Sequence, residues 1–272
     1  MRQWLSLVQL DENEFQLHSE RTQMKPTKNL KEKIAFVQGG SRGIGAAIVR
    51  RLASEGATVA FTYNAAQRDA ERLVSEVTGD GGCVIAIRAD SADPQQLQLA
   101  IRRATEHFGG LDILVNNAGI LPWGPLEELT LDEIDRTLAI NVRSVIIASQ
   151  EAARHMRAGG RMINIGSINA ERIPIAGGAV YAMSKASVVG FTKGLARDLG
   201  PRSITVNNVQ PGPVDTDMNP ENSETASQLK KLMALGRYGK DHEIASFVAF
   251  LAGPEAGYIT GASLSIDGGF SA

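Results

Sequence analysis

Short apolar runs alternate with longer amphipathic stretches from Lys31 onward, and this alternation limits the folds that the chain can adopt. Short apolar runs between turn residues are typical of buried strands, whereas the longer stretches carry apolar residues at helical spacing. Strands that alternate with helices indicate a parallel sheet, because a crossover through a helix joins neighbouring parallel strands. Helices then cover both faces of the sheet.

Glycine and proline set several of the boundaries. Gly56 ends the first predicted helix, and Pro94 lies near the first turn of the third. The predicted strands are 34–37, 58–62, 84–87, 113–115, 161–165 and 205–209, and the predicted helices are 46–54, 66–78, 94–108, 131–157 and 181–199. No composition break or internal repeat divides the chain. We therefore expect one α/β domain over residues 30–272, with a doubly wound parallel sheet of about seven strands and helices on both faces.

Residues 1–29 differ from the rest and are predicted to be a flexible N-terminal extension. Their short apolar patch lacks the basic start, long apolar run and small-residue cleavage site of a secretory signal. No stretch approaches the roughly 18 apolar residues that span a bilayer. Met24 offers an alternative start, which would make residues 1–23 an appendage; an ordered interaction segment is the other alternative. We expect a cytoplasmic protein.

Charge and cysteine content exclude several function classes. With 28 basic and 30 acidic side chains, the formal net charge of -2 gives no electrostatic reason to bind nucleic acid or an anionic membrane. The single cysteine, Cys83, lies in an apolar run and is predicted to be a core residue rather than a reactive thiol. No metal site is expected, because the histidines are scattered without ligand spacing: His18, His107, His155 and His242.

A glycine-rich loop follows the first predicted strand and opens the first helix. Gly39, Gly43 and Gly45 allow the backbone to turn tightly and to approach a pyrophosphate at the helix N-terminus. This context favours a dinucleotide site over a purely structural turn. Ser41, Arg42 and Ile44 complete the loop and are expected to contact the cofactor.

The choice between NAD(H) and NADP(H) depends on charges near the adenosine ribose. An acidic residue about 20 positions beyond the loop would bind the 2′-hydroxyl, but the second predicted strand ends in Thr62-Tyr63-Asn64. Tyr63 and Asn64 are therefore expected beside the ribose without a carboxylate. Arg42 offers a guanidinium to a 2′-phosphate, which favours NADP(H) over NAD(H). Arg42 could instead be a solvated loop residue, and Arg68 is either a second phosphate contact or a surface residue.

Tyr181 and Lys185 lie four apart, fourteen residues after Ser167. Four-residue spacing places both side chains on one helix face. A nearby ammonium favours the phenolate, and the phenol's unperturbed pKa of about 10 makes it a poor base without such help. By itself the pair occurs by chance on many helices. The glycine loop makes it a candidate for hydride-transfer chemistry.

Together, these motifs resemble those of the short-chain dehydrogenase/reductase family, in its single-domain Rossmann-type branch, from Lys31 to the C-terminus. The ordered motifs are the glycine loop, Asp90, Asn116-Asn117-Ala118-Gly119, Asn141, Ser167, Tyr181 with Lys185, Pro211-Gly212 and Ile266-Asp267-Gly268-Gly269. Gln38 replaces the family's usual threonine and puts the rigidity of the loop in doubt, while Gly166 replaces a frequent serine. Within the family, the chain is most similar to cyclic-di-GMP-binding biofilm-dispersal mediators and to 3-oxoacyl-carrier-protein reductase-like members.

The resemblance implies a role for each member of a catalytic set. Tyr181 would exchange a proton with the substrate oxygen, and Lys185 would lower the phenol's pKa and hold the nicotinamide ribose. Ser167 would hydrogen-bond the same oxygen. Asn141 would fix a water that links Lys185 to solvent. The alternatives are a satisfied buried amide for Asn141 and a strand-end cap for Ser167.

The resemblance also implies cofactor contacts at the strand ends. Asp90 and Ser91 would border the adenine, although Ser91 and Asp93 also fit a helix cap. Further contacts would be Asn117, Ala118 and Gly119 beneath the adenosine ribose, and Pro211, Gly212, Val214 and Thr216 at the nicotinamide carboxamide.

The substrate is expected between residues 120–126, 168–178 and 214–232, with 219–228 as a lid. The first two segments contribute the apolar side chains Leu121, Trp123, Ile168, Ile173 and Ile175, which suggest an apolar carbonyl compound. A 3-oxoacyl thioester or a small apolar ketone would fit. A carrier protein would need a basic surface near the mouth; Arg154, Arg157 and Arg161 form a candidate cluster or a solvated helix face.

The oligomeric state and the binding of cyclic di-GMP each have alternatives. Small residues on the helices 131–157 and 181–199 face sister subunits in the resembling family, so a homotetramer is expected, with a dimer as the alternative. A signalling protein that binds cyclic di-GMP on the same fold is the competing function class, and a structural relic of the fold is a third. The intact Ser167, Tyr181 and Lys185 argue against both as sole functions.

Overall fold

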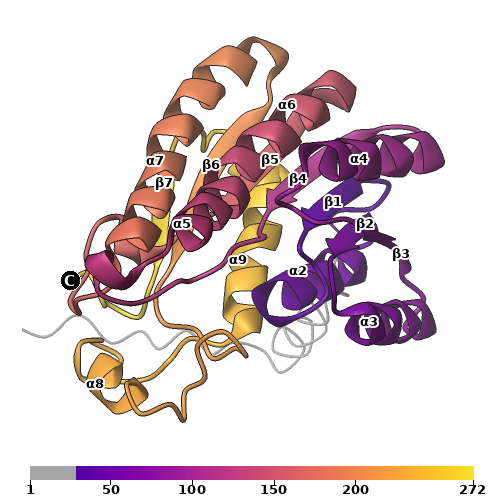
Figure 1. Cartoon of the computed structure of the whole chain (residues 1–272). Coiled ribbons are helices and arrows are strands. Elements are labelled where there is room, and N and C mark those ends of the chain that lie inside the picture. Colours follow the sequence, from indigo (N-terminus) through magenta and orange to yellow (C-terminus); the bar gives the residue numbers. More distant parts are fainter. Residues whose placement is uncertain (1–28) are drawn as a thin grey trace, which may run out of the picture.

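The structure is a computed structural model, and it describes residues 29–272. Within these residues, seven strands form one parallel sheet in the order β3-β2-β1-β4-β5-β6-β7 (Figure 1). The strands are β1 (Ile34–Gln38), β2 (Thr58–Tyr63), β3 (Cys83–Arg88), β4 (Leu111–Asn116), β5 (Met156–Ile165), β6 (Thr205–Pro211) and β7 (Ser263–Ile266). The predicted seven-stranded, doubly wound sheet is confirmed. The predicted extension, residues 1–29, lies outside the described residues except for Asn29.

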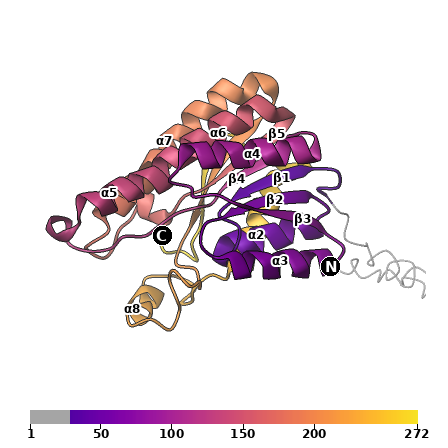
Figure 2. The same ribbon diagram turned by 45° about the vertical axis from the view of Figure 1, so that its right-hand side comes forward.

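The helices cover the sheet on both sides (Figures 1 and 2). They are α2 (Gly43–Ser54), α3 (Gln67–Gly79), α4 (Pro94–Phe108), α5 (Leu131–Leu138), α6 (Ser144–His155), α7 (Ala179–Leu199), α8 (Ala226–Lys231) and α9 (Asp241–Ala252). Helices α2, α3 and α9 pack on one face, and α4, α6 and α7 on the other. In β1, Val37 joins the first core and Phe36 the second, because successive side chains of a strand point to opposite faces.

The segment 131–157, predicted to be mostly helix, is helical as far as His155, but the structure divides it into two helices. Thr130 and Glu133 form a capping box that begins α5, and a π-helical turn, Ala139–Arg143, separates α5 from α6. The helix ends at His155, and the chain passes directly into β5. Helix α9 and strand β7 did not appear among the elements predicted from the sequence.

The predicted burial of Cys83 in the core is wrong, because the side chain is exposed. Cys83 is the first residue of β3, and β3 is an edge strand of the sheet. The neighbouring Val84 is buried, so the apolar run was correctly identified as a strand but its first side chain faces outward.

No helix in residues 29–272 has the length and hydropathy of a membrane span. In the same range, no three His, Cys, Asp or Glu side chains are grouped as metal ligands. His155 lies 3.2 Å from the Glu151 carboxylate, and His18 is outside the described part of the chain.

Candidate active site

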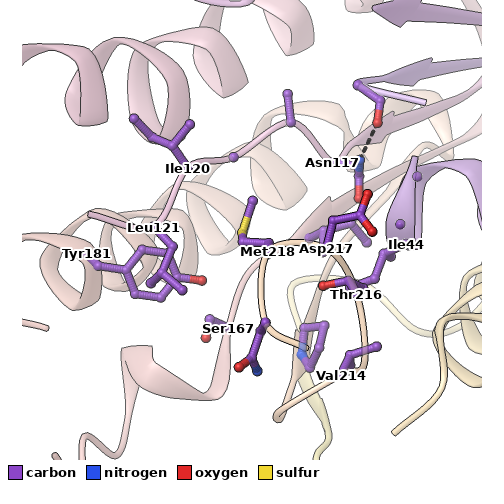
Figure 3. Close-up of a pocket in the computed structure, with 18 of the residues that line it drawn as sticks. Ile44, Asn117, Ile120, Leu121, Ser167, Tyr181, Val214, Thr216, Asp217 and Met218 are labelled. Atoms are coloured by element: carbon purple, nitrogen blue, oxygen red, sulfur yellow. Dashed lines mark hydrogen bonds between the residues drawn. The ribbon is translucent and has the colours of Figure 1, made fainter. Parts of the chain in front are cut away.

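A cavity of about 980 Å³ opens at the carboxyl ends of the parallel strands. This is where an open parallel sheet binds ligands. Every residue predicted to contact a cofactor lines it, namely Gly39, Ser41, Arg42, Gly43, Ile44, Gly45, Tyr63, Asn64, Asp90, Ser91, Asn117, Ala118, Gly119, Tyr181, Lys185, Pro211, Gly212, Val214 and Thr216. Figure 3 shows side chains from distant parts of the chain converging here.

The glycine loop is held by contacts with neighbouring strands. The Asn117 side-chain amide donates a hydrogen bond to the Gly39 carbonyl oxygen at 2.7 Å, and a Cβ on Gly45 would lie 2.1 Å from that oxygen. The Gly39 N–H donates to the Thr62 hydroxyl at 2.9 Å. Thr62 of β2 therefore secures the loop in a chain that carries Gln38 before the first glycine. The Gln38 amide instead donates to Ser144 at 2.9 Å.

Arg42 and the start of α2 form a positive end of the cavity. Arg42 is the N-cap residue of α2, and its side chain makes no capping hydrogen bond. It is exposed, and it forms no ion pair with another residue of the described chain. Backbone N–H groups at a helix N-terminus attract anions, and the guanidinium adds to this field. Arg68, by contrast, does not line the cavity.

Asp90 has a partner that the sequence did not reveal. Arg136 of α5 also lines the cavity, and its guanidinium lies 3.6 Å from the Asp90 carboxylate. Asp93 accepts hydrogen bonds from the N–H groups of Gln95 and Gln96 and is the cap of α4. Ser91 lines the cavity. Of the two alternatives for this segment, the helix cap therefore applies to Asp93, and the cofactor contact is kept for Ser91.

Tyr181 and Lys185 both line the cavity from α7. The Lys185 ammonium lies 5.8 Å from the centroid of the Tyr181 ring and donates to the Ile165 carbonyl oxygen at 2.9 Å. Burial lowers the pKa of Lys185 to about 8. Burial also raises the pKa of Tyr181, and a hydrogen bond from Ser167 opposes that rise.

The expected lowering of the Tyr181 pKa by Lys185 is therefore corrected, because desolvation is the largest influence on the phenol. The ammonium is directed to the Ile165 carbonyl rather than to the phenol oxygen. Tyr181 points its hydroxyl into the cavity, where Ser167 lies below it (Figure 3). A protonated phenol that is half-buried on the wall of the cavity is suited to donate a proton.

Asn141 lies behind the cavity rather than on its wall. Its amide nitrogen donates to the Ile120 carbonyl oxygen at 2.9 Å and to the Ser184 hydroxyl at 3.0 Å, and its oxygen accepts from the Ile120 N–H at 2.9 Å. It occupies the π-helical turn, a feature that is frequent at functional sites. A Cβ on Gly119 would lie 3.4 Å from the Lys185 nitrogen and 3.5 Å from the Asn141 oxygen. The two polar atoms thus converge beside Gly119.

The other end of the cavity is lined mainly by apolar side chains. They are Ile120, Leu121, Trp123, Ile168, Pro174, Ile175, Met218, Leu229 and Phe270. The predicted lid contributes polar residues and Pro220 to the lining, whereas Ile173 does not reach it. Met218 and Asp217 were not predicted as site residues, although the segment that contains them had been singled out. In Figure 3, Asp217 lies beside Thr216 and Ile44, toward the glycine loop.

The candidate basic cluster for a carrier protein is not at this mouth. None of Arg154, Arg157 and Arg161 lines the cavity. Arg154 pairs with Glu151 at 2.9 Å, and Arg157 pairs with Asp112 at 3.3 Å. Arg161 is partly buried, and its register partners are Ile113 and Thr205, which lie near the amino ends of their strands.

Comparison with known proteins identifies related chains. A family model described as enoyl-(acyl carrier protein) reductase matches residues 39–271. The cyclic-di-GMP-binding biofilm dispersal mediator protein of Escherichia coli (strain K12) is 50% identical over 240 residues, which cover 88% of this chain and 98% of that protein.

Two solved structures share the fold at high identity. A short-chain dehydrogenase/reductase from Serratia marcescens BCRC 10948 is 72% identical, with a TM-score of 0.89 over 90% of this chain and 100% of that chain. A short-chain dehydrogenase from Burkholderia cenocepacia J2315, solved in complex with NADP, is 55% identical, with a TM-score of 0.89 and the same coverage.

Proposed function

This chain belongs to the short-chain dehydrogenase/reductase family, and from that membership we propose that it is an NADP(H)-dependent oxidoreductase acting on a carbonyl or alcohol substrate. The observation that carries the proposal is the placement of Ser167, Tyr181 and Lys185 on one wall of the cavity that the glycine loop also lines. A protein that only binds a ligand has no chemical need for this set.

NADPH, when bound, supplies the hydride that reduces the carbonyl carbon. Tyr181 donates its phenolic proton to the carbonyl oxygen, and its raised pKa keeps that proton in place near neutral pH. Ser167 hydrogen-bonds the same oxygen as negative charge develops. One hydride and one proton convert the carbonyl to an alcohol, and the reverse transfers oxidise it.

Lys185 and Asn141 replace the proton that Tyr181 gives up. The Lys185 ammonium and the Asn141 oxygen both face the space beside Gly119. A water there can accept a hydrogen bond from Lys185 and donate one to Asn141, which would link the region of the phenol to solvent. Lys185 also lies where it can hold the nicotinamide ribose.

Three observations support NADP(H) over NAD(H). Arg42 is an exposed cation at the glycine-loop end of the cavity. Tyr63 ends β2 and Asn64 follows it, where an NAD(H) enzyme would place an acidic residue. The Burkholderia cenocepacia relative was solved with NADP.

The substrate and the assembly are further parts of the proposal. The apolar end of the cavity favours a 3-oxoacyl thioester or a small apolar ketone, and a 3-oxoacyl-[acyl-carrier-protein] reductase of Vibrio cholerae, 41% identical to this chain over 244 residues, supports the thioester. We propose a homotetramer in the cytoplasm. The half-exposed Ile146 of α6 and Met183 of α7 give these helices apolar surface for subunit contact.

The test follows NADPH absorbance with a panel of ketones, quinones and 3-oxoacyl thioesters. We expect carbonyl-dependent NADPH oxidation, and we expect Tyr181→Phe to lower kcat by roughly 100- to 10,000-fold while NADPH still binds. Tyr258→Phe, at a fully exposed tyrosine outside the cavity, is the matched control and should leave kcat unchanged. Substantial activity in Tyr181→Phe would contradict the mechanism.

A second candidate function is the binding of cyclic di-GMP. It is favoured by the Escherichia coli relative, which is described as binding that nucleotide. Arg42 and the free N–H groups of α2 suit the phosphates of either ligand. A titration with cyclic di-GMP, with and without NADPH, tests this candidate: binding that NADPH abolishes places both ligands in one cavity, and no binding rejects it.

A further inference from the structure

Trp123 is held in one orientation at the apolar end of the cavity. Its indole N–H donates a hydrogen bond to the Ala176 carbonyl oxygen at 2.8 Å. Next to it, the Gly124 N–H donates to the Gly177 carbonyl oxygen at 3.1 Å. These two bonds tie the segment after β4 to the segment that leads into α7, only a few residues before Tyr181. The ring is therefore positioned before any substrate arrives.

One face of the indole lies on the backbone of two glycines. A Cβ on Gly178 would lie 2.7 Å, 2.9 Å and 3.3 Å from three neighbouring atoms of the six-membered ring of Trp123. A Cβ beyond the ring edge would be much closer to one atom than to its neighbours, so these similar distances place the Cβ position above the face. A Cβ on Gly177 would lie 2.8 Å and 2.9 Å from the nitrogen and adjacent carbon of the five-membered ring. The glycine pair thus leaves room for a flat ring and for nothing larger.

Because the two glycines cover one face of Trp123, we assign its exposed area to the opposite face and the ring edge. The side chain is 42% exposed and lines the same cavity as Tyr181. Met218, which is 50% exposed, lines this cavity too, and a thioether contacts aromatic rings favourably. In Figure 3, Met218 lies between Leu121 and Asp217. A large, fixed, exposed aromatic face inside a cavity is a surface that a ligand can cover.

The charged side chains of the cavity lie elsewhere. Among the described residues that line it, these are Arg42, Asp90, Arg136, Lys185 and Asp217. The first three belong to the adenosine end, Lys185 is beside Tyr181, and Asp217 lies toward the glycine loop (Figure 3). No cation therefore accompanies Trp123 to neutralise a carboxylate or phosphate on the substrate, and an uncharged substrate is favoured.

We propose that Trp123 determines substrate specificity, and that its open face stacks on the flat ring of an uncharged aromatic ketone or of the corresponding alcohol. Stacked aromatic pairs gain attraction beyond the area that they bury, which a puckered ring of the same size does not. Preorganisation by Ala176 and the two glycines removes the cost of ordering the indole on binding. This proposal rests on the proposed reductase function and names the substrate class of the same site.

The experiment compares two ketones that differ in ring flatness, acetophenone and cyclohexyl methyl ketone. For Trp123→Leu, we expect kcat/KM for acetophenone to fall by roughly 3- to 10-fold relative to kcat/KM for cyclohexyl methyl ketone. Trp123→Phe keeps a ring and should lie between the wild type and Trp123→Leu. Leu131→Ala, at an exposed apolar residue outside the cavity, should leave the ratio unchanged.

A second variant perturbs the platform without changing Trp123. Gly178→Ala introduces a methyl group 2.7 Å from the indole and displaces it, at a position whose φ of -96° alanine adopts without strain. The ratio of kcat/KM for acetophenone to kcat/KM for cyclohexyl methyl ketone should fall, as it should for Trp123→Leu. Thermal unfolding of each variant verifies that the comparison is made on folded protein.

The outcomes separate this proposal from the reductase function. If no carbonyl compound of the wider panel oxidises NADPH, the reductase proposal fails. If the enzyme reduces carbonyl compounds but neither ketone, or only the cyclohexyl ketone, the platform proposal is wrong and the reductase proposal stands. The platform proposal is also wrong if Trp123→Leu and Gly178→Ala change kcat/KM for both ketones equally or leave both values unchanged.

Discussion

The two ends of the cavity are built in different ways. At the cofactor end, backbone turns follow the central strands, and hydrogen bonds such as Asn117 to Gly39 and Gly39 to Thr62 fix them against the sheet. At the substrate end, side chains project from loops and short helices, and two of them, Ile168 and Phe270, belong to a small cluster of five buried residues, Ile168, Ala226, Met233, Tyr238 and Phe270. The first end depends on where the backbone lies, whereas the second depends on which side chains the loops carry.

This difference predicts how each end responds to mutation. A backbone-built site fails when a side chain enters the space that the ligand or the turn needs. A site built from side chains changes its preference among substrates, because loop residues can be exchanged while the scaffold holds. Mutations at the cofactor end should therefore affect all substrates alike, and mutations at the substrate end should separate one substrate from another.

The largest effect is expected for Gly45→Ala. Its methyl group would lie 2.1 Å from the Gly39 carbonyl oxygen and 2.6 Å from the Asn117 amide nitrogen, so the loop must move. Overpacking of this kind costs about 1–3 kcal/mol, and we expect NADPH affinity to fall by roughly 10- to 100-fold. Fluorescence titration with NADPH measures the change, and every carbonyl substrate should lose activity in proportion.

The matched control is Gly79→Ala. Gly79 is the last residue of α3, and nothing lies within 4 Å of the position of its Cβ. Its NADPH affinity should equal that of the wild type. If Gly45→Ala also bound NADPH normally, the cofactor end would not depend on backbone approach, and the contrast between the two ends would be wrong.

The cofactor end could largely be predicted from the sequence, because a tight turn between a strand and a helix requires glycine at particular positions. The same holds for Tyr181 and Lys185, which one helix places side by side. Gln38 shows the limit of this reasoning. The doubt that it raised about the loop concerned a missing hydroxyl, and the structure provides one from Thr62, a residue of the adjacent strand.

The contacts that could not be predicted join segments far apart in the chain. The Arg136 guanidinium lies 3.6 Å from the Asp90 carboxylate on the cavity wall, and Trp123 lies on Gly177 and Gly178. Neither contact leaves a periodic signal, because it depends on how two distant segments of the chain meet after folding. The π-helical turn at Asn141 was missed for a related reason, since its apolar spacing is that of an uninterrupted helix.

An intermediate effect is expected for Arg42→Gln, which tests whether side-chain charge also contributes at the cofactor end. A hydrogen bond to a charged group contributes about 1.5–3 kcal/mol, so KM for NADPH should rise by roughly 10-fold or more. KM for NADH should change by less than about twofold, because NADH lacks the 2′-phosphate. Steady-state kinetics with both cofactors measure the two values.

Arg68→Gln provides the control for Arg42→Gln. Arg68 is exposed on α3 and does not line the cavity, so its removal should leave KM for NADPH unchanged. An equal rise of KM for NADPH in the two variants would make Arg68 a second phosphate contact. If Arg42→Gln raised KM for NADH as much as KM for NADPH, Arg42 would hold the loop and would not bind the phosphate.

The smallest effect is the pH dependence of the rate, which depends on Lys185, the residue between the two ends of the cavity. Burial lowers the pKa of Lys185 to about 8, so the ammonium is present below that pH and is lost above it. Burial raises the pKa of Tyr181, so the phenol stays protonated through the same range. The rate of carbonyl reduction should therefore fall to half its plateau near pH 8, through Lys185 alone.

The pH profile also assigns Lys185 to one end of the cavity. NADPH binding to Tyr181→Phe, which lacks the titrating phenol, measures the cofactor end separately. If that affinity decreases as the pH rises, in parallel with the wild-type rate, the ammonium acts by holding the cofactor. If affinity is constant while kcat falls, Lys185 acts by resupplying the proton beside Gly119. A rate that stays constant to about pH 10 would exclude both roles for the charge, because a lysine with a pKa of about 8 is neutral there.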